Sequence, residues 1–219
     1  SSSAFKVMEI IQSREFVKHL ITFENVLPSI MASKSYDAAT QELYFDPEIY
    51  NVKTKQWIRD PSSNQDVKPT YLQAHRAYLE MLFISKDKLT GFISLKIEHI
   101  SPVFAKEFLA LIIREANNLN REIDIDNSNK ALIYLKLQLP QTSLVEIKKS
   151  INQLIESQLE IQMMASIHQE YSLMILEPPF IPDVRSRPAR SIIVIFCTLI
   201  GGILGVILVL VRHFTSGKQ

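Results

Sequence analysis

The stretch "EPPFIPDVRSRPARSIIVIFCTLIGGILGVILVLVRHF", from Glu177 to Phe214, ends a chain that is otherwise mostly polar and charged. No charged residue occurs between Ser191 and Val211. As a helix this run would span roughly 31 Å, about the hydrocarbon thickness of a bilayer. A buried core helix is the less favoured alternative, because core helices rarely run this long without a polar residue. The pattern therefore predicts a C-terminal transmembrane helix over 191–211, followed by a short tail over 212–219.

Three glycines lie inside this apolar run, at Gly201, Gly202 and Gly205. Gly201 and Gly205 are four residues apart and would share one helix face, where small residues let two helix backbones approach closely. Glycine is also frequent in membrane helices without any packing role. Both interpretations stay open, and we keep the three glycines as candidate residues for helix packing.

A proline-rich segment over 178–190 precedes the apolar run. Its prolines predict a stiff, extended lead-in to the bilayer. The balance of basic residues on the two sides of the run differs too little to fix an orientation by the positive-inside rule. The candidate motif consists of Pro178, Pro182, Arg185, Pro188 and Arg190.

The remaining residues, 1–177, suffice for one domain with its own core. Lys and Arg number 24 against 23 Asp and Glu, so no basic excess suggests a nucleic-acid partner. Apolar spacing predicts helices from Ala4 to Ser33, with a break near Ser13 and a stop at Pro28. Turn-rich sequence up to Pro69 predicts loops and short strands, with Trp57 anchored against the core.

Further elements follow from the same patterns. We expect a helix from Pro69 to Phe83, and alternation over 92–97 predicts a strand. Ser101 followed by Pro102 is typical of a helix start. A short strand over 171–179 is expected to pair with the strand at 92–97. The predicted fold class is therefore α/β, a base domain with a small sheet and long helices.

A long helical region is predicted from about Ser128 to Tyr171, with a break at Pro140. Apolar residues recur in it at three-to-four spacing, so one stripe faces a partner. Packing within one subunit and packing between subunits explain this stripe equally well. The candidate oligomer-contact residues are Leu144, Ile147, Ile151 and Leu154.

No catalytic constellation stands out. The five histidines are scattered without metal-ligand spacing, and no glycine-rich phosphate loop or nucleophile motif is present. Glu122, Asp124 and Asp126 could bind a cation, but a solvated helix end is the favoured interpretation. We expect no cofactor, no metal and no enzymatic activity.

Several segments resemble the chain-length determinant family, the Wzz-type polysaccharide co-polymerases. These are "TGFISL" from Thr90, "HISPVFA" from His99, the stretch from Ile155 to Tyr171, and the proline-rich lead-in to "GGILG". Their order and spacing carry the resemblance, which covers Ala4 to Val211.

The resemblance implies two membrane helices flanking a periplasmic α/β domain in the bacterial inner membrane. The first membrane helix is absent from this sequence, and we expect that it was removed or lies upstream of Ser1. The resemblance further implies a homo-oligomer that sets O-antigen length in lipopolysaccharide, with a Wzy-type polymerase acting on lipid-linked polysaccharide. By family topology 178–190 would be periplasmic, and 212–219 would be a short cytoplasmic tail. The alternatives are a co-polymerase for capsule or exopolysaccharide export, and a single-pass membrane adaptor or sensor.

Overall fold

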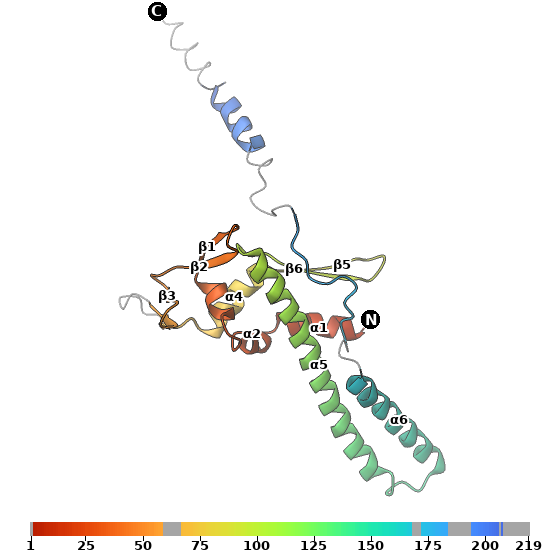
Figure 1. The fold of residues 1–219 in the computed structure, drawn as a ribbon. Helices are drawn as coiled ribbons and strands as arrows, with labels where there is room; N and C mark the ends of the chain where they lie inside the picture. Colours follow the sequence, from red (N-terminus) through yellow and green to blue (C-terminus); the bar gives the residue numbers. More distant parts are fainter. Residues whose placement is uncertain (1, 59–66, 168–171, 184–193, 206, 208–219) are drawn as a thin grey trace, which may run out of the picture. The chain divides into compact units, whose positions relative to one another are not determined.

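The computed structural model describes residues 2–58, 67–167, 172–183, 194–205 and 207. Two units are distinguished, Ser1–Ile181 and Pro182–Gln219. The first unit holds all the strands and the two long helices among the described residues (Figure 1).

Three short helices open the first unit: α1 (Ser2–Gln12), α2 (Arg14–Leu20) and α3 (Val26–Met31). Ser13 separates α1 from α2, because its hydroxyl oxygen accepts the N–H of Phe16 and caps α2. The predicted break at Ser13 is therefore confirmed. The predicted stop at Pro28 is wrong, since Pro28 lies in the first turn of α3, where a helix does not need the missing N–H.

Two small hairpins follow. Strand β1 (Ser33–Asp37) pairs antiparallel with β2 (Glu42–Phe45), and β3 (Tyr50–Asn51) pairs antiparallel with β4 (Gln56–Trp57). The Trp57 ring lies 5.0 Å from that of Tyr50 and packs against the core. The predicted short strands and the anchoring role of Trp57 are confirmed.

A third hairpin lies beside helix α4 (Tyr71–Met81), which starts in a capping box formed by Thr70 and Gln73. The chain turns directly from α4 into β5 (Leu82–Lys86), which pairs antiparallel with β6 (Ile93–Ile97). The prediction of β6 is confirmed. The strand β5 was missed, because its first residues continue the apolar pattern of the preceding helix.

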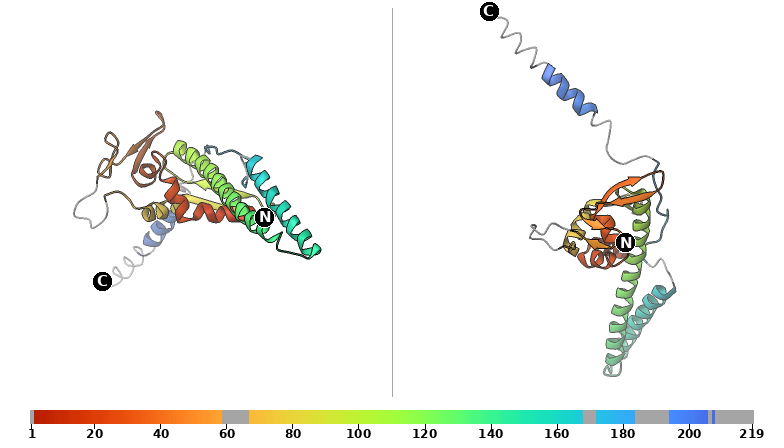
Figure 2. Two further views of the ribbon diagram at one scale, coloured as in Figure 1. Left: turned by 90° about the horizontal axis from the view of Figure 1, so that it is seen from below. Right: turned by 60° about the vertical axis from the view of Figure 1, so that its left-hand side comes forward.

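Helix α5 (Pro102–Gln138) is the longest described element, with 37 residues. The Ser101 hydroxyl caps it by accepting the N–H of Phe104, and Pro102 occupies its first turn, as predicted. Its C-terminal part runs beside α6 (Val145–Ile167), as both views in Figure 2 show. The break at Pro140 is confirmed, because the chain reverses between the two helices there.

The core of this unit forms where α1, α2 and α4 meet the first half of α5. Tyr78 and Phe108 are among its largest members, with their rings edge-to-face at 6.0 Å. The Tyr78 hydroxyl donates to the carbonyl of Ile11 at 3.1 Å, and burial raises the pKa of this phenol. Phe104 stacks on Phe108 at 5.1 Å and extends the core toward β6.

The predicted strand over 171–179 is wrong. Residues 172–179 contain no described strand, and the described partner of β6 is β5 rather than this segment. The segment instead lies against α5, where the side chain of Asn117 accepts the backbone N–H groups of Ser172 and Leu173. Residue 171 lies outside the described residues.

The predicted transmembrane helix is also wrong and is removed from the fold class. Within 191–211 the structure describes a helix over 194–205 and residue 207, and the other positions lie outside the described residues. Among the described residues, no helix has both the length and the apolar character that crossing a membrane requires. What remains is a mixed fold of helices and three small two-stranded sheets in the described part of the chain.

Candidate functional site

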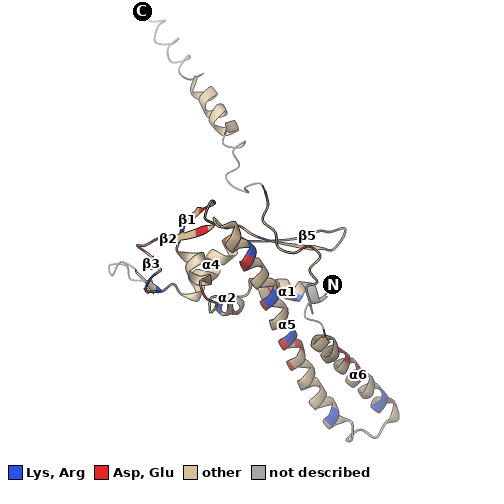
Figure 3. Ribbon diagram, viewed as in Figure 1, with Lys and Arg blue, Asp and Glu red and all other residues tan. Residues whose placement is uncertain are grey.

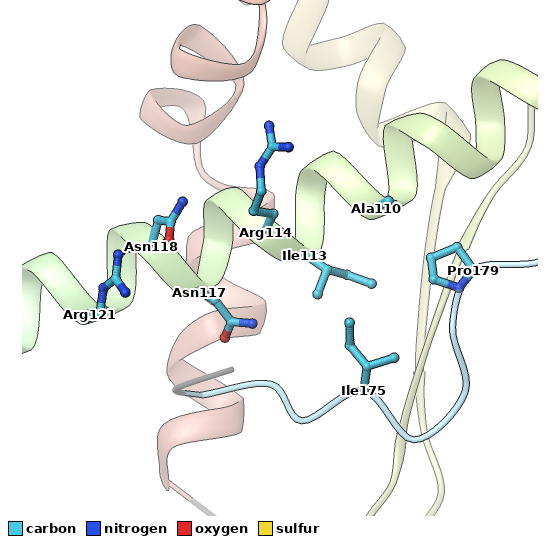
Figure 4. Close-up of a pocket in the computed structure, with 8 residues that line it drawn as sticks. All are labelled: Ala110, Ile113, Arg114, Asn117, Asn118, Arg121, Ile175 and Pro179. Carbon is cyan, nitrogen blue, oxygen red and sulfur yellow. Dashed lines mark hydrogen bonds between the residues drawn. The ribbon is translucent and has the colours of Figure 1, made fainter. Parts of the chain in front are cut away.

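A cavity of about 400 Å³ lies between α5 and the extended segment over 172–181. Figure 4 shows Arg114, Asn118 and Arg121 projecting on one side of α5, and Ile113 and Ile175 pointing toward one another. None of its lining residues is acidic. The lining residues are Ala110, Ile113, Arg114, Asn117, Asn118, Arg121, Ile175 and Pro179.

Helical spacing places both arginines on one face. Arg114 and Arg121 are seven residues apart, two helical turns, and Asn118 lies between them. Figure 3 shows both basic and acidic residues along α5. The face that lines the cavity carries Arg114 and Arg121 and no acidic residue.

The side chain of Arg114 is oriented by a hydrogen bond from its Nε. Its Nε donates to Oε1 of Glu115 at 2.9 Å, and its guanidinium carbon lies 6.0 Å from the ring centre of Phe23. These contacts fix the plane of the guanidinium while its side chain stays 62% exposed. Arg114 thus lines the cavity while its Nε is engaged by Glu115.

Arg121 is held differently. Its Nη2 donates to Oδ1 of Asn118 at 3.2 Å, so a neutral amide orients this half-buried cation. Within the described ranges, no carboxylate forms an ion pair with Arg121. A positioned guanidinium without a counter-charge is suited to bind an oxyanion.

The opposite wall of the cavity is fixed by Asn117. Its Oδ1 accepts the N–H groups of Ser172 and Leu173, and its Nδ2 donates to the carbonyl of Leu173. These bonds hold the segment that carries Ile175 and Pro179 against α5. The cavity thus has a basic side and an apolar side.

A second cavity of about 330 Å³ lies on the α2 side of α5 and has an acidic lining that includes Glu15, Glu115 and Glu122. The His19 ring hydrogen-bonds Glu115 through Nε2 at 2.9 Å. Burial tends to raise the pKa of Glu115, but the hydrogen bonds from His19 and Arg114 outweigh it, and the pKa is lowered. Glu115 is therefore a structural carboxylate that joins α2 to α5.

The acids considered for a cation lie in the middle of α5, not at a helix end. Asp124 pairs with Lys6, and Asp126 pairs with Lys130 at 2.6 Å. Lysines therefore already neutralise two of these carboxylates. No group of His, Cys, Asp and Glu within the described residues could hold a metal ion.

The second functional feature is the surface of the α5–α6 hairpin. Of the predicted contact residues, Ile151 is buried, whereas Leu144, Ile147 and Leu154 are exposed. Ile151 is buried in the α5–α6 hairpin. The two helices are also joined by a hydrogen bond, in which Nε2 of Gln162 donates to Oδ1 of Asn129 at 2.7 Å. The predicted stripe is thus divided between packing inside the chain and an exposed surface.

A further exposed row on α6, which we call the α6 stripe, lies beyond the four predicted contact residues. Leu159, Met163 and Ile167 follow one another at intervals of four and are 48%, 56% and 66% exposed. Ile133 and Leu137 of α5 are also exposed and four apart. The apolar pattern read from the sequence reached Leu159, and its continuation to the end of α6 would have added Met163 and Ile167.

The remaining predicted residues lie in the second unit or at the boundary. Gly201, Gly202 and Gly205 lie in the helix over 194–205. Pro178 and Pro182 lie in described extended chain, whereas Arg185, Pro188 and Arg190 lie outside the described residues. Packing by the glycines and the role of the proline-rich segment stay predictions.

The cavity residues were also missed. Two arginines seven apart with "NN" between them, in "REANNLNR", signal a polar helix face. The wall that completes the site comes from more than fifty residues further along the chain, which no local pattern shows. No protein-family model and no curated protein matches this chain.

Proposed function

We propose that this protein is a non-catalytic regulator of polysaccharide chain length that works as a homo-oligomer. Its partners are a Wzy-type polymerase and lipid-linked polysaccharide, with the O-antigen of lipopolysaccharide as the product. The domain acts on the periplasmic side of the bacterial inner membrane.

The observation that carries the proposal is the apolar surface of the α5–α6 hairpin. The α6 stripe, together with Ile133 and Leu137, leaves a row of large apolar side chains in solvent on each helix. Contiguous exposed apolar surface is typical of a protein interface. A second copy is the occupant we assign, because a hairpin with apolar residues on both helices lets neighbouring hairpins pack side by side into a closed assembly.

The sequence resemblance supports the same function. It rests on "HISPVFA", among other segments, and His99 in that motif has a clear structural task. Its Nε2 hydrogen-bonds the carbonyl of Ser29, and its Nδ1 accepts the N–H of Ser101. The motif thus joins the start of α5 to the end of α3 and directs the long helix away from the base.

The test is deletion of the encoding gene in its host, followed by a silver-stained gel of extracted lipopolysaccharide. We expect the modal cluster of chain lengths to be replaced by a steadily decaying ladder, and the wild-type gene to restore it. An unchanged ladder in a host without a second such gene would refute O-antigen control. The chain lengths of capsule and exopolysaccharide are then compared in the same strains. A change in either would favour an export co-polymerase, and no change would favour a protein with no role in glycan assembly.

A further inference from the structure

We propose that the cavity between α5 and the segment over 172–181 binds a sugar that carries an oxyanion, a hexuronate or a sugar phosphate. The oxyanion follows from the cavity alone. The choice of a sugar as its carrier rests on the proposed function.

The charge of the cavity is the first step. Two guanidinium groups line it and no carboxylate does. Glu115 lies behind Arg114 and bonds its Nε, so it offsets one positive charge without occupying the cavity. Arg121 keeps its full charge, since its described partner is the neutral amide of Asn118.

The geometry of the donors is the second step. Both arginines are pre-oriented, Arg114 by Glu115 and Arg121 by Asn118. Ordering before binding lowers the entropy cost of forming charge-assisted hydrogen bonds. Guanidinium groups bind carboxylate and phosphate in a two-pronged way that an ammonium group cannot reproduce.

The apolar wall is the third step. Ile175 and Pro179 of the extended segment and Ile113 of α5 line an apolar part of a space of about 400 Å³, which lies in the size range of small-ligand sites. A free inorganic anion would leave this wall unused. A sugar ring presents C–H groups to such a wall and hydroxyl groups to side-chain amides, and Asn118 supplies one.

The stability of the wall is the fourth step. Asn117 is 4% exposed, and both the oxygen and the nitrogen of its side-chain amide hydrogen-bond the backbone of 172–173. The wall is therefore part of the folded domain before any ligand arrives. Asn117 is a positioning residue, and Arg114 and Arg121 are the binding residues.

The experiment is titration calorimetry on the full chain with glucuronate, glucose 1-phosphate, inorganic phosphate and neutral glucose. We expect the two acidic sugars to bind more tightly than phosphate and glucose, and less tightly as salt is raised. Arg121→Gln should weaken acidic-sugar binding about tenfold or more, the scale of one charge-assisted hydrogen bond. Arg121→Lys keeps the positive charge but cannot form the two parallel hydrogen bonds of a guanidinium, and should recover only part of the affinity.

Arg76→Gln is the matched control, because Arg76 is an exposed arginine of α4 outside the cavity. Circular dichroism of each variant verifies that it is folded. No binding of acidic sugars at millimolar concentration, or equal losses for Arg121→Gln and Arg76→Gln, would overturn the site. Phosphate binding as tightly as glucose 1-phosphate would overturn the sugar as carrier. The readout is independent of the lipopolysaccharide gel, so a bound sugar with an unchanged ladder would reject the proposed function and keep the site.

Discussion

Asn117 pairs both ends of its side-chain amide with the backbone of Leu173. Oδ1 accepts the N–H at 2.8 Å, and Nδ2 donates to the carbonyl at 3.2 Å. One side chain thereby satisfies the two polar groups that a neighbouring strand would otherwise satisfy. This explains how the segment after α6 can lie on α5 without forming the strand that its sequence suggests.

Replacing Asn117 by Ala is expected to destabilise the domain by about 1–3 kcal/mol, because peptide groups of 172–173 lose their partner. The measurement is urea unfolding of wild type and variant. Asn127→Ala serves as the control, since Asn127 is an exposed residue of the same helix, and should change stability by less than about 0.5 kcal/mol. Equal midpoints for the two variants would show that the amide pairing does not stabilise the fold.

The pH dependence of stability is predicted to include His99. Burial lowers the pKa of this imidazole, so the unfolded chain takes up the proton at a higher pH than the folded chain does. The contribution to stability is therefore complete above the unfolded pKa of about 6.5 and is lost as the pH falls below it. Protonation of Nδ1 would also remove its hydrogen bond from the N–H of Ser101.

Thermal unfolding between about pH 7 and pH 5 tests this prediction. The wild type should lose stability across this window, and His99→Gln should lose less. His75→Gln is the control, because His75 is a more exposed histidine that bonds the carbonyl of Gln12. Parallel pH profiles for wild type and His99→Gln would assign the acid sensitivity to other groups.

Local signals in the sequence predicted local structure well. Ser13, Ser101 and Pro102 mark helix starts because capping depends on neighbouring residues. The continuity of α5 was missed because "REIDIDNSNK" has almost no apolar periodicity. Ion pairs stabilise the helix there instead, Lys6 with Asp124 and Lys130 with Asp126, and the first joins residues 118 positions apart.

The candidate site was harder to predict than the fold elements. Arg114 and Arg121 lie on one helix face, which spacing alone reveals once the helix is assigned. That they line a cavity depends on Ile175 and Pro179, in a segment that Asn117 holds against α5. Contacts of this kind depend on the tertiary structure and leave no periodic signal.

Truncating Phe108 tests the assignment of the core. Phe108→Ala should cost about 3–5 kcal/mol, because it removes a buried ring that contacts Tyr78 and Phe104 and leaves a cavity. Chemical unfolding measures the loss. Phe92→Ala removes the same group from the exposed end of the β5–β6 hairpin and should cost far less. A similar loss for both would place the core elsewhere.

The α6 stripe carries the proposed assembly, and charge should disrupt it. Leu159→Glu with Met163→Glu places two carboxylates where a second copy would bury apolar side chains, and burying an unpaired charge is costly. Both residues are exposed in the isolated chain, so we expect the monomer to remain folded. Analytical ultracentrifugation should show an oligomer for the wild type and a monomer for the double variant.

The control for this experiment is Ser157→Glu, which adds a carboxylate to an exposed position on a different face of α6. It should leave the oligomer intact and, in the deletion strain, restore the modal cluster of lipopolysaccharide. The double variant should not restore it, because chain-length control is proposed to need the assembled form. An oligomer that survives both stripe substitutions would mean that copies meet through another surface. A monomeric double variant that still restores the cluster would separate assembly from length control.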